Sequence, residues 1–367
     1  MSSENDRQHQ DLTRTFSRLW KYIVLFVLVV ASTIVFYLKN EESSTISLNY
    51  KVEKDSLKLT TTYLFENTNI SYWKAPDSDT ISNETKKQLV AYGKELIAHT
   101  AKYLGPKGSV MQLSNGMNCQ NCHLDAGTKI YGNNYGSVAS LYPKFRARSG
   151  KVEDIYKRVN DCIERSLNGK PLVNSSKEMQ AIKAYIEFIG SNVPKGKKAE
   201  GSGFRELAYL ERAADPLRGA EVYKGKCQSC HQANGEGVLN TEGNEYTYPP
   251  LWGVNSYNDG AGLYRLSNFA RYVKYNMPLG VNHDNTQLSN EEAWDVAAFI
   301  NSQERPHKIV DKDWPDISKK PIDHPFGPYA DNFSEIQHKY GPFQPILDQQ
   351  LEKSAMLKSD KEQSAKK

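Results

Sequence analysis

Two short cysteine motifs constrain this 367-residue chain more than any other feature of its sequence. In each motif two cysteines are separated by two residues and followed directly by a histidine. The six residues are, in chain order, Cys119, Cys122, His123, Cys227, Cys230 and His231. This spacing is typical of covalent haem c attachment, in which the thiols hold the porphyrin and the histidine is the proximal iron ligand. We therefore expect two haem c groups in a mainly α protein, with two class I cytochrome c-like domains in tandem.

A charge-free stretch near the N-terminus predicts the location of the protein. Residues 22–38 contain no charged side chain, and Lys21 and Lys39 flank them. At about 1.5 Å per residue this stretch reaches roughly 26 Å, close to the hydrocarbon thickness of a bilayer. Basic residues precede it, which predicts a cytoplasmic N-terminus over 1–21, a transmembrane helix over 22–38 and haem domains in the periplasm, at the plasma (inner) membrane. A cleaved signal peptide is the alternative, and it gives the same compartment.

The charge balance of the chain is nearly even. Lysine and arginine number 47 against 43 aspartates and glutamates, for a formal net charge of +4. Proteins that bind nucleic acid normally carry a clear basic excess. We therefore expect no nucleic-acid partner.

Helical periodicity and composition predict the rest of the domain organisation. Amphipathic helices are expected over 84–104, 151–167, 177–189, 215–223 and 289–300, the last with a capping box formed by Ser289 and Glu292. The expected parts are, in order, a stalk and domain edge (39–80), a first haem domain (81–193), a linker (194–205), a second haem domain (206–305), an irregular C-terminal extension that wraps the domains (306–346) and a disordered tail (347–367).

Cys162 is the one cysteine that the two motifs do not use. The halves of the chain share landmarks, because each closes with a helix that has a glutamate near its start, Glu178 and Glu291. Cys162 and Met277 lie at similar distances before these glutamates. We therefore predict that Met277 is the sixth iron ligand opposite His231, and that Cys162 occupies the same position opposite His123.

Alternatives to both sulfur ligands stay open. His283 or Lys274 could replace Met277, since each is close to it in sequence. Cys162 could instead be a small buried thiol packed in a helix, which is the usual state of a free cysteine.

The neighbours of Cys162 predict an anion site. On a helix, Arg158 and Ser166 lie four residues before and after it, so the three side chains share one face. Arg148 lies in the loop before this helix. Guanidinium groups pair bidentately with small oxyanions, although solvated surface charges are the alternative for each arginine.

From about residue 92 to residue 346 the chain resembles the dihaem c-type thiosulfate dehydrogenases. The resemblance is carried by GMNCQNCHLDAGT, SLYPKFRARSG, RVNDCIERSLNGK, NMPLG, PFGPYADNFS and QHKYGPFQPI. It implies oxidation of two thiosulfates to tetrathionate, or the reverse reaction, at a haem ligated by His123 and Cys162. It also implies that Arg148, Arg158 and Ser166 line the substrate pocket. Some members have a lysine directly before the ligand methionine, where this chain has Asn276.

The resemblance implies that electrons pass through the second haem to a cytochrome or another respiratory acceptor. The expected mechanism is a covalent sulfur adduct on Cys162, which divides the coupling of two sulfurs into separate steps. Two other functions remain open at this point. One is a dihaem electron carrier without its own substrate, and the other is an oxidoreductase of a different sulfur compound.

Overall fold

The computed structural model describes residues 71–364. The predicted transmembrane segment, residues 22–38, lies outside this range. Within the described residues, no helix combines the length and the apolar composition that a membrane span needs.

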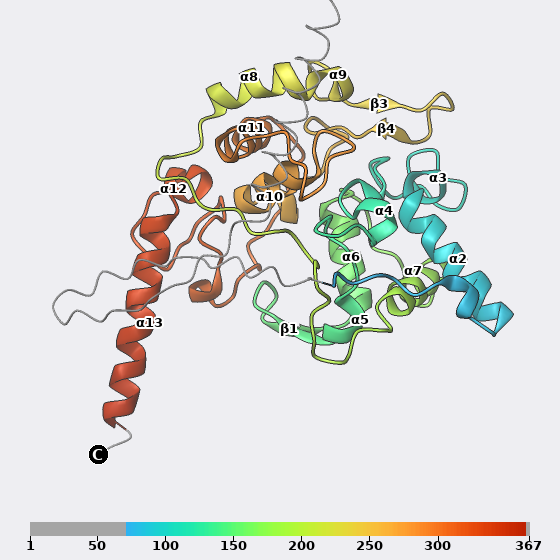
Figure 1. Ribbon diagram of the computed structural model, residues 1–367, viewed down its shortest axis with the longest axis horizontal. Helices are drawn as coiled ribbons and strands as arrows, with labels where there is room; N and C mark the ends of the chain where they lie inside the picture. Colours follow the sequence, from blue (N-terminus) through green and yellow to red (C-terminus); the bar gives the residue numbers. More distant parts are fainter. Residues whose placement is uncertain (1–70, 365–367) are drawn as a thin grey trace, which may run out of the picture. The chain divides into compact units, whose positions relative to one another are not determined.

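The described chain is mainly helical, as expected (Figure 1). Before the linker the helices and strands are α2 (Glu84–Ala98), α3 (Thr100–Leu104), α4 (Leu124–Gly127), α5 (Val138–Leu141), β1 (Lys144–Arg146), β2 (Lys151–Glu153), α6 (Ile155–Arg165) and α7 (Lys177–Ile189). After the linker they are α8 (Pro216–Lys226), α9 (Gln228–His231), β3 (Val238–Leu239), β4 (Tyr246–Tyr248), α10 (Leu266–Asn276), α11 (Asn290–Ser302), α12 (Glu335–Tyr340) and α13 (Gln344–Ser364). Short 3-10 helices cover Ser78–Thr80, Cys119–Asn121, Gly262–Tyr264 and Ile317–Lys319.

In each expected haem domain, 81–193 and 206–305, the first long helix packs against the closing helix. Helix α2 lies against α7, and α8 lies against α11 (Figure 1). A glycine stands at each crossing. A Cβ added at Gly93 would lie 2.0 Å from the Ala181 carbonyl oxygen, and one added at Gly219 would lie 1.9 Å from that of Asp295. The same close backbone approach therefore occurs twice, which gives the internal repeat a structural counterpart.

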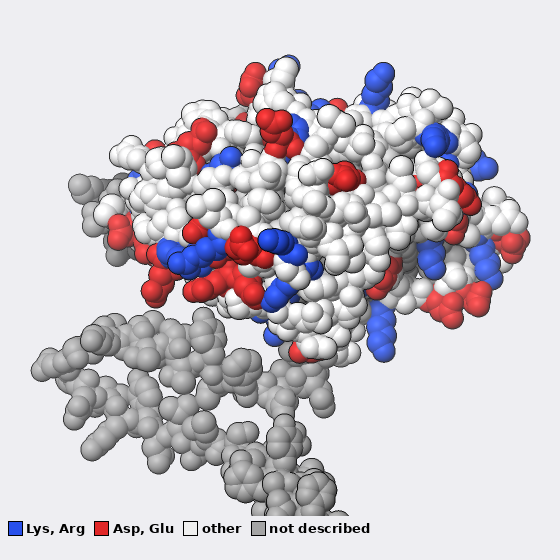
Figure 2. All heavy atoms as spheres, turned by 90° about the horizontal axis from the view of Figure 1, so that it is seen from above, with Lys and Arg blue, Asp and Glu red and all other residues white. Residues whose placement is uncertain are grey.

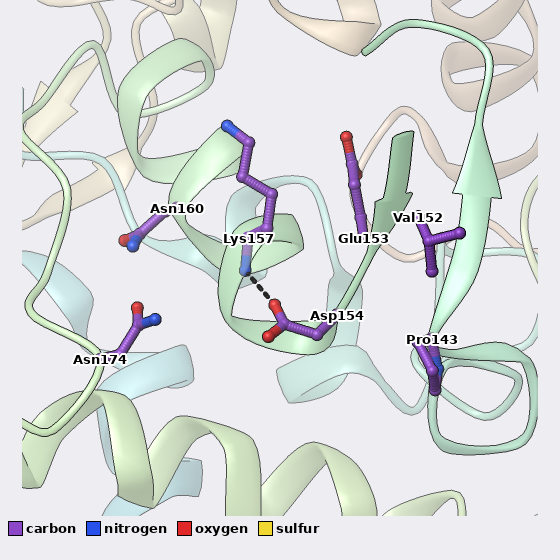
Figure 3. A pocket seen from close by; sticks show the side chains of 7 residues that line it. All are labelled: Pro143, Val152, Glu153, Asp154, Lys157, Asn160 and Asn174. Atoms are coloured by element: carbon purple, nitrogen blue, oxygen red, sulfur yellow. Dashed lines mark hydrogen bonds between the residues drawn. The ribbon is translucent and has the colours of Figure 1, made fainter. Parts of the chain in front are cut away.

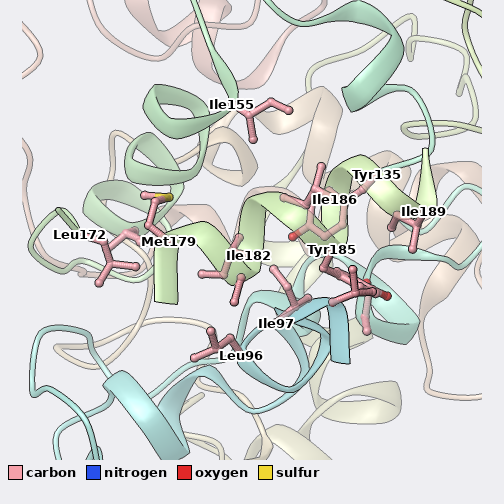
Figure 4. Close-up of a cluster of buried hydrophobic side chains, with 14 of the residues drawn as sticks. Leu96, Ile97, Tyr135, Ile155, Leu172, Met179, Ile182, Tyr185, Ile186 and Ile189 are labelled. Carbon is pink, nitrogen blue, oxygen red and sulfur yellow. The ribbon is translucent and has the colours of Figure 1, made fainter. Parts of the chain in front are cut away.

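Two separate hydrophobic cores support these helix pairs. The first core fills the space around α2, α6 and α7 (Figure 4). Its most buried members include Leu96, Ile97, Met179 and Ile182. The second core is centred on Trp294 and the other inward residues of α11. Because apolar burial is the main driving force of folding, each half has the core that an independent domain requires.

Two of the predicted helices begin or break elsewhere than expected. Residues 151–153 form strand β2, which pairs with β1 in a hairpin where Phe145 faces Val152. Helix α6 begins only after Asp154, whose side chain accepts a hydrogen bond from the Lys157 N–H and caps the helix. The expected helix over 84–104 breaks at His99, which leaves the helical region. By contrast, α7 has the expected bounds, and α11 carries the predicted Ser289 and Glu292 capping box.

The C-terminal part is more regular than expected. The segment 306–334 is mostly irregular, but α12 and α13 follow it. Disorder was expected from residue 347, whereas α13 runs from Gln344 to Ser364. Ile346 is fully buried and anchors the start of this helix. After it come leucine, glutamate, lysine, glutamine and alanine without glycine or proline, and these are strong helix formers.

Charges of both signs are interspersed on the surface. On the face shown in Figure 2, lysine and arginine side chains lie among aspartates and glutamates. This agrees with the nearly even charge balance of the sequence.

Candidate functional site

The first haem motif begins in the 3-10 helix Cys119–Asn121 and is tied back to the start of α3. The Cys119 N–H donates to the Thr100 hydroxyl at 2.9 Å. The imidazole of His123 donates from Nδ1 to the Asn133 carbonyl at 2.6 Å, and the ring of Tyr135 stacks on it at 4.4 Å. Burial lowers the pKa of His123 to about 4, against the opposing effect of the Asn133 carbonyl. The ring is therefore neutral, and its Nε2 is free of a proton, as a metal ligand requires.

The second motif lies in α9 and has the same arrangement. His231 donates from Nδ1 to the Pro249 carbonyl at 2.8 Å, and burial lowers its pKa. The two carbonyl partners differ in position, because Pro249 lies 18 residues after His231, whereas Asn133 lies 10 residues after His123. The two halves thus hold their histidines through different loops.

A largely apolar cavity of about 320 Å³ adjoins the second motif. Its lining includes Cys227, Cys230, His231 and Met277. This combination of two thiols, an imidazole and a thioether around an apolar space fits a haem c with histidine and methionine ligands. Among the alternatives to Met277, the Lys274 amine donates to the Leu288 carbonyl and the His283 ring packs between two tyrosines, and neither lines the cavity.

The cavity extends to the first motif. Asn121 and Cys122 also line it. The buried Tyr272 of α10 donates its hydroxyl to the Asn121 carbonyl at 2.6 Å. The backbone between the first pair of cysteines therefore contacts the second domain, and the two candidate haem sites are neighbours.

Cys162 lies on α6 and is half-buried. A thiolate at Cys162 is the largest cause that raises the pKa of Arg158 above its ordinary value. Burial raises the pKa of Cys119 to about 11 and that of Cys122 to about 12. A thiolate at Cys162 acts in the same direction on both thiols. Cys162 is therefore beside Arg158 and within electrostatic reach of both thiols of the first motif.

The two predicted arginines differ in how they are held. Arg158 makes no ion pair with any carboxylate in the described part of the chain. Arg148 has a side chain only 16% exposed, and its Nε lies 4.0 Å from Asp313 and has no hydrogen-bond partner among residues 71–364. Burial lowers the pKa of Arg148 to about 10, and the nearby charges of Arg165 and Arg158 act in the same direction. The positive charges of Arg148, Arg158 and Arg165 exceed the single negative charge of Asp313, which favours binding of an anion.

Ser166 is one turn from Cys162. It caps α6, and its N–H donates to the Cys162 carbonyl at 2.8 Å. Its hydroxyl makes no hydrogen bond to another residue that the structure describes. The predicted face of Arg158, Cys162 and Ser166 is thus present on one helix, and Arg148 approaches it from the preceding loop.

The tail contributes residues that the sequence did not identify. Asp313 accepts two hydrogen bonds from Arg165, at 2.8 and 2.9 Å. Trp314 packs its ring against the Arg148 guanidinium at 5.8 Å, and its backbone N–H donates to the Arg148 carbonyl. His324 lies against Trp314 at 5.9 Å. No spacing rule relates these residues to Cys162, and the sequence predicted only that the extension 306–346 wraps the domains.

A second hollow, of about 420 Å³, lies on the other side of α6 (Figure 3). It is lined by Pro143, Val152, Glu153, Asp154, Lys157, Asn160 and Asn174. The dashed line in Figure 3 is the capping bond from the Lys157 N–H to Asp154. None of the haem-motif residues and no cysteine borders this hollow, so it is separate from the candidate site.

Comparisons with known proteins agree with this arrangement. Residues 109–194 match the model of the SoxA/TsdA cytochrome c domain, and residues 217–304 match the model of cytochrome c. The chain therefore has two cytochrome c domains in tandem, as expected, and these are consistent with two covalently bound haem c groups.

Several characterised proteins are similar over most of their length. A thiosulfate dehydrogenase from Psychrobacter arcticus is 38% identical over 244 residues, which are 66% of this chain and 71% of that protein. One from Stutzerimonas stutzeri is 34% identical over 64% of this chain and 74% of its own length. Among solved structures, the thiosulfate dehydrogenase TsdBA from Marichromatium purpuratum, in its as-isolated form, superposes with a TM-score of 0.59 at 32% identity. That match covers 65% of this chain and only half of the solved chain.

Proposed function

This chain belongs to the thiosulfate dehydrogenase family, and from that premise we propose that it oxidises two thiosulfates to tetrathionate at Cys162. The observation that carries the proposal is the pairing of Cys162 with Arg158 beside the thiols of the first haem motif. A sulfur nucleophile and an arginine without a carboxylate partner are what a reaction on a sulfur oxyanion needs.

Arg158 and Arg148 bind the thiosulfate dianion and direct its outer sulfur to the Cys162 thiolate. The first step forms an S–S bond between the two sulfurs and releases two electrons, so that the cysteine carries a thiosulfate group. A second thiosulfate then attacks this group at the sulfur bonded to Cys162. The S–S bond to Cys162 breaks, the thiolate is restored and tetrathionate leaves. The sum is two thiosulfates converted to one tetrathionate and two electrons.

The residues proposed to hold the haems are arranged in two sets. Cys119, Cys122, His123 and Cys162 would hold the first, and Cys227, Cys230, His231 and Met277 would hold the second. When bound, the haems supply one-electron acceptors, and methionine ligation raises the potential of the second. The shared border at Asn121 and Tyr272 supports passage of electrons between the two sites.

The location of the protein and its electron partner complete the proposal. We propose that residues 22–38 anchor the protein in the inner membrane, with the haem domains in the periplasm. The charge-free composition of this segment and its basic flank support that topology. The electrons then pass to a cytochrome or another respiratory acceptor. Fractionation of cells, with the haem stain expected in the membrane pellet, tests the anchor.

An assay of the purified holoprotein with thiosulfate and ferricyanide tests the reaction. We expect reduction of ferricyanide with one tetrathionate formed per two thiosulfates consumed. Cys162→Gly should abolish turnover while both haems remain attached, because the nucleophile is removed and the attachment thiols are not.

The other functions predict different results. A plain electron carrier shows no turnover with thiosulfate, and Cys162→Met only shifts a reduction potential. An enzyme for another sulfur compound is inactive with thiosulfate and active with sulfite or an organic thiosulfonate. Undiminished turnover in Cys162→Gly would rule out the proposed chemistry.

A further inference from the structure

The loop that carries Met277 makes much of its packing with residues outside the second domain. We define this ligand loop as residues 277–288, between α10 and α11. Within the loop, the side chain of Asn282 forms a local turn by accepting hydrogen bonds from the backbone N–H groups of Asp284 and Asn285. Leu279 in the same loop is 73% exposed. These local contacts alone give the loop little resistance to opening.

Lys129 of the first domain reaches the ligand loop directly. It lies six residues after the motif histidine, His123, and its amine donates to the Val281 carbonyl at 3.0 Å. Val281 is 3% exposed, so this carbonyl belongs to a buried part of the loop. Burial lowers the pKa of Lys129, which agrees with an amine held inside a contact rather than in water.

His283 of the ligand loop inserts between two tyrosines. Its ring lies 5.1 Å from Tyr72 and 5.0 Å from Tyr131, edge-on to both. Arg205, at the end of the linker, donates to the His283 carbonyl at 2.8 Å. Edge-to-face aromatic pairs of this kind add to the stability that burial alone provides.

The residue before Met277 is also held by the first domain. Asn276 is 1% exposed, and its amide donates to the Tyr131 carbonyl at 3.2 Å. The backbone of Tyr131 in turn donates to the Gly201 carbonyl. Residues outside the second domain therefore contact the ligand loop at Val281 and at His283, and they also contact Asn276, directly before the loop.

We propose that Lys129 and Tyr131 of the first domain, together with His283, are positioning residues that hold the ligand loop closed and so keep the Met277 sulfur available to the second haem iron. This rests on the proposed ligation by His231 and Met277. A thioether is a neutral ligand, and its attachment depends on how the loop that presents it is held. The first domain thereby sets how completely the second haem keeps its sixth ligand.

Lys129→Met is the sharpest test, because it changes a residue of the first domain whose amine donates to the Val281 carbonyl of the ligand loop. We expect the oxidised holoprotein to lose part of its methionine-to-iron absorption band. In the reduced protein, carbon monoxide should bind the second haem at about tenfold lower concentration, since one charge-assisted hydrogen bond no longer opposes opening. His283→Ala should act in the same direction.

Lys183→Met is the matched control. Lys183 belongs to the first domain but pairs with Glu187 on its own helix at 2.7 Å. This variant should keep the absorption band and the carbon monoxide affinity of the unmodified protein. A merely structural effect of losing a lysine would change both variants alike, and that result would contradict the proposal.

Met277→Ala separates this proposal from the one on which it rests. If Met277→Ala removes the band while Lys129→Met and His283→Ala leave it unchanged, the ligand assignment stands and the positioning role is wrong. If the unmodified protein has no such band, the ligand assignment and the positioning role both fail.

Discussion

Arg158 and Arg165 lie two turns apart on one helix, yet they are held in different ways. The guanidinium of Arg165 donates two hydrogen bonds to the Asp313 carboxylate. Arg158 makes no ion pair within residues 71–364, and the Cys162 thiolate is the main influence on its pKa. Arg165 is therefore part of the framework, whereas Arg158 is available to a substrate anion.

Replacement of Arg158 by methionine tests this distinction. Arg158→Met should lower kcat/KM for thiosulfate by about a hundredfold, because it removes a charge-assisted contact to the anion and leaves most of the side-chain volume. Lys157→Met is the matched control, since Lys157 pairs with Asp161 at 2.6 Å and borders the separate hollow of Figure 3. Equal losses in both variants would contradict a role in substrate binding.

His324 gives the folded protein a dependence on pH. Burial lowers its pKa to about 4, and the charges of Lys320 and Arg148 act in the same direction. Between its unfolded pKa of about 6.5 and this value, the unfolded chain binds a proton that the folded chain does not. The free energy of unfolding therefore falls as the pH decreases through this window.

Denaturant unfolding of the holoprotein at two pH values measures this effect. From pH 7 to about pH 4.5, His324 should reduce the free energy of unfolding by about 2 kcal/mol. The His324→Gln variant should lose less stability than the unmodified protein over the same interval. Parallel losses in both proteins would show that another group is responsible.

The two helix crossings define the domains at the scale of elements. Both place a glycine where the backbone of the closing helix approaches most closely, Gly93 against α7 and Gly219 against α11. Any side chain at these positions would overlap a carbonyl oxygen, so the helices would have to separate.

Alanine at either crossing should destabilise its domain. We expect Gly219→Ala to lower the free energy of unfolding by about 3 kcal/mol, since an added methyl group in a tight contact forces the backbone to shift. Gly225→Ala is the control on the same helix, because nothing lies within 4 Å of the added Cβ. That change should be neutral or slightly stabilising, as alanine is the better helix former. Similar effects at both glycines in thermal unfolding would contradict the close-approach argument.

At the scale of the whole described chain, the tail joins the two domains. Asp313 pairs with Arg165 of the first domain, and Trp314 contacts Arg148. Further along the tail, Phe343 and Ile346 are buried in the core of the second domain. One segment thus contacts Arg148 and Arg165 of the first domain and also packs into the core of the second.

Asp313→Asn should weaken this connection. The change leaves two arginines without their carboxylate, and we expect a loss of about 3 kcal/mol in the free energy of unfolding. Asp316→Asn is the control three residues away, since Asp316 is half exposed and its carboxylate pairs with its close neighbours in sequence, Ser318 and Lys319. Thermal unfolding should occur at a lower temperature in Asp313→Asn than in Asp316→Asn. A protease should also cut the tail of Asp313→Asn first. Equal stability of both variants would show that the ion pair contributes little.

Local sequence patterns were enough to predict the haem motifs and several helices. The spacing of cysteines and histidines identified both haem motifs, because covalent attachment requires a fixed sequence of adjacent groups. Helical periodicity was enough to place Arg158, Cys162 and Ser166 on one face, since it depends only on the rise of a single helix. The same local rule gave α7 its bounds and α11 its cap.

The tertiary structure decided what joins distant parts of the chain. The sequence alone could not pair Arg165 with Asp313, 148 residues later, or Lys129 with the Val281 carbonyl, 152 residues later. Periodicity reports which face of an element is buried but not which partner covers it. The sequence by itself therefore determined the haem motifs and the helix face of Arg158, Cys162 and Ser166, whereas packing between domains and tail determined what surrounds Arg148 and Arg165 and what contacts the Met277 loop.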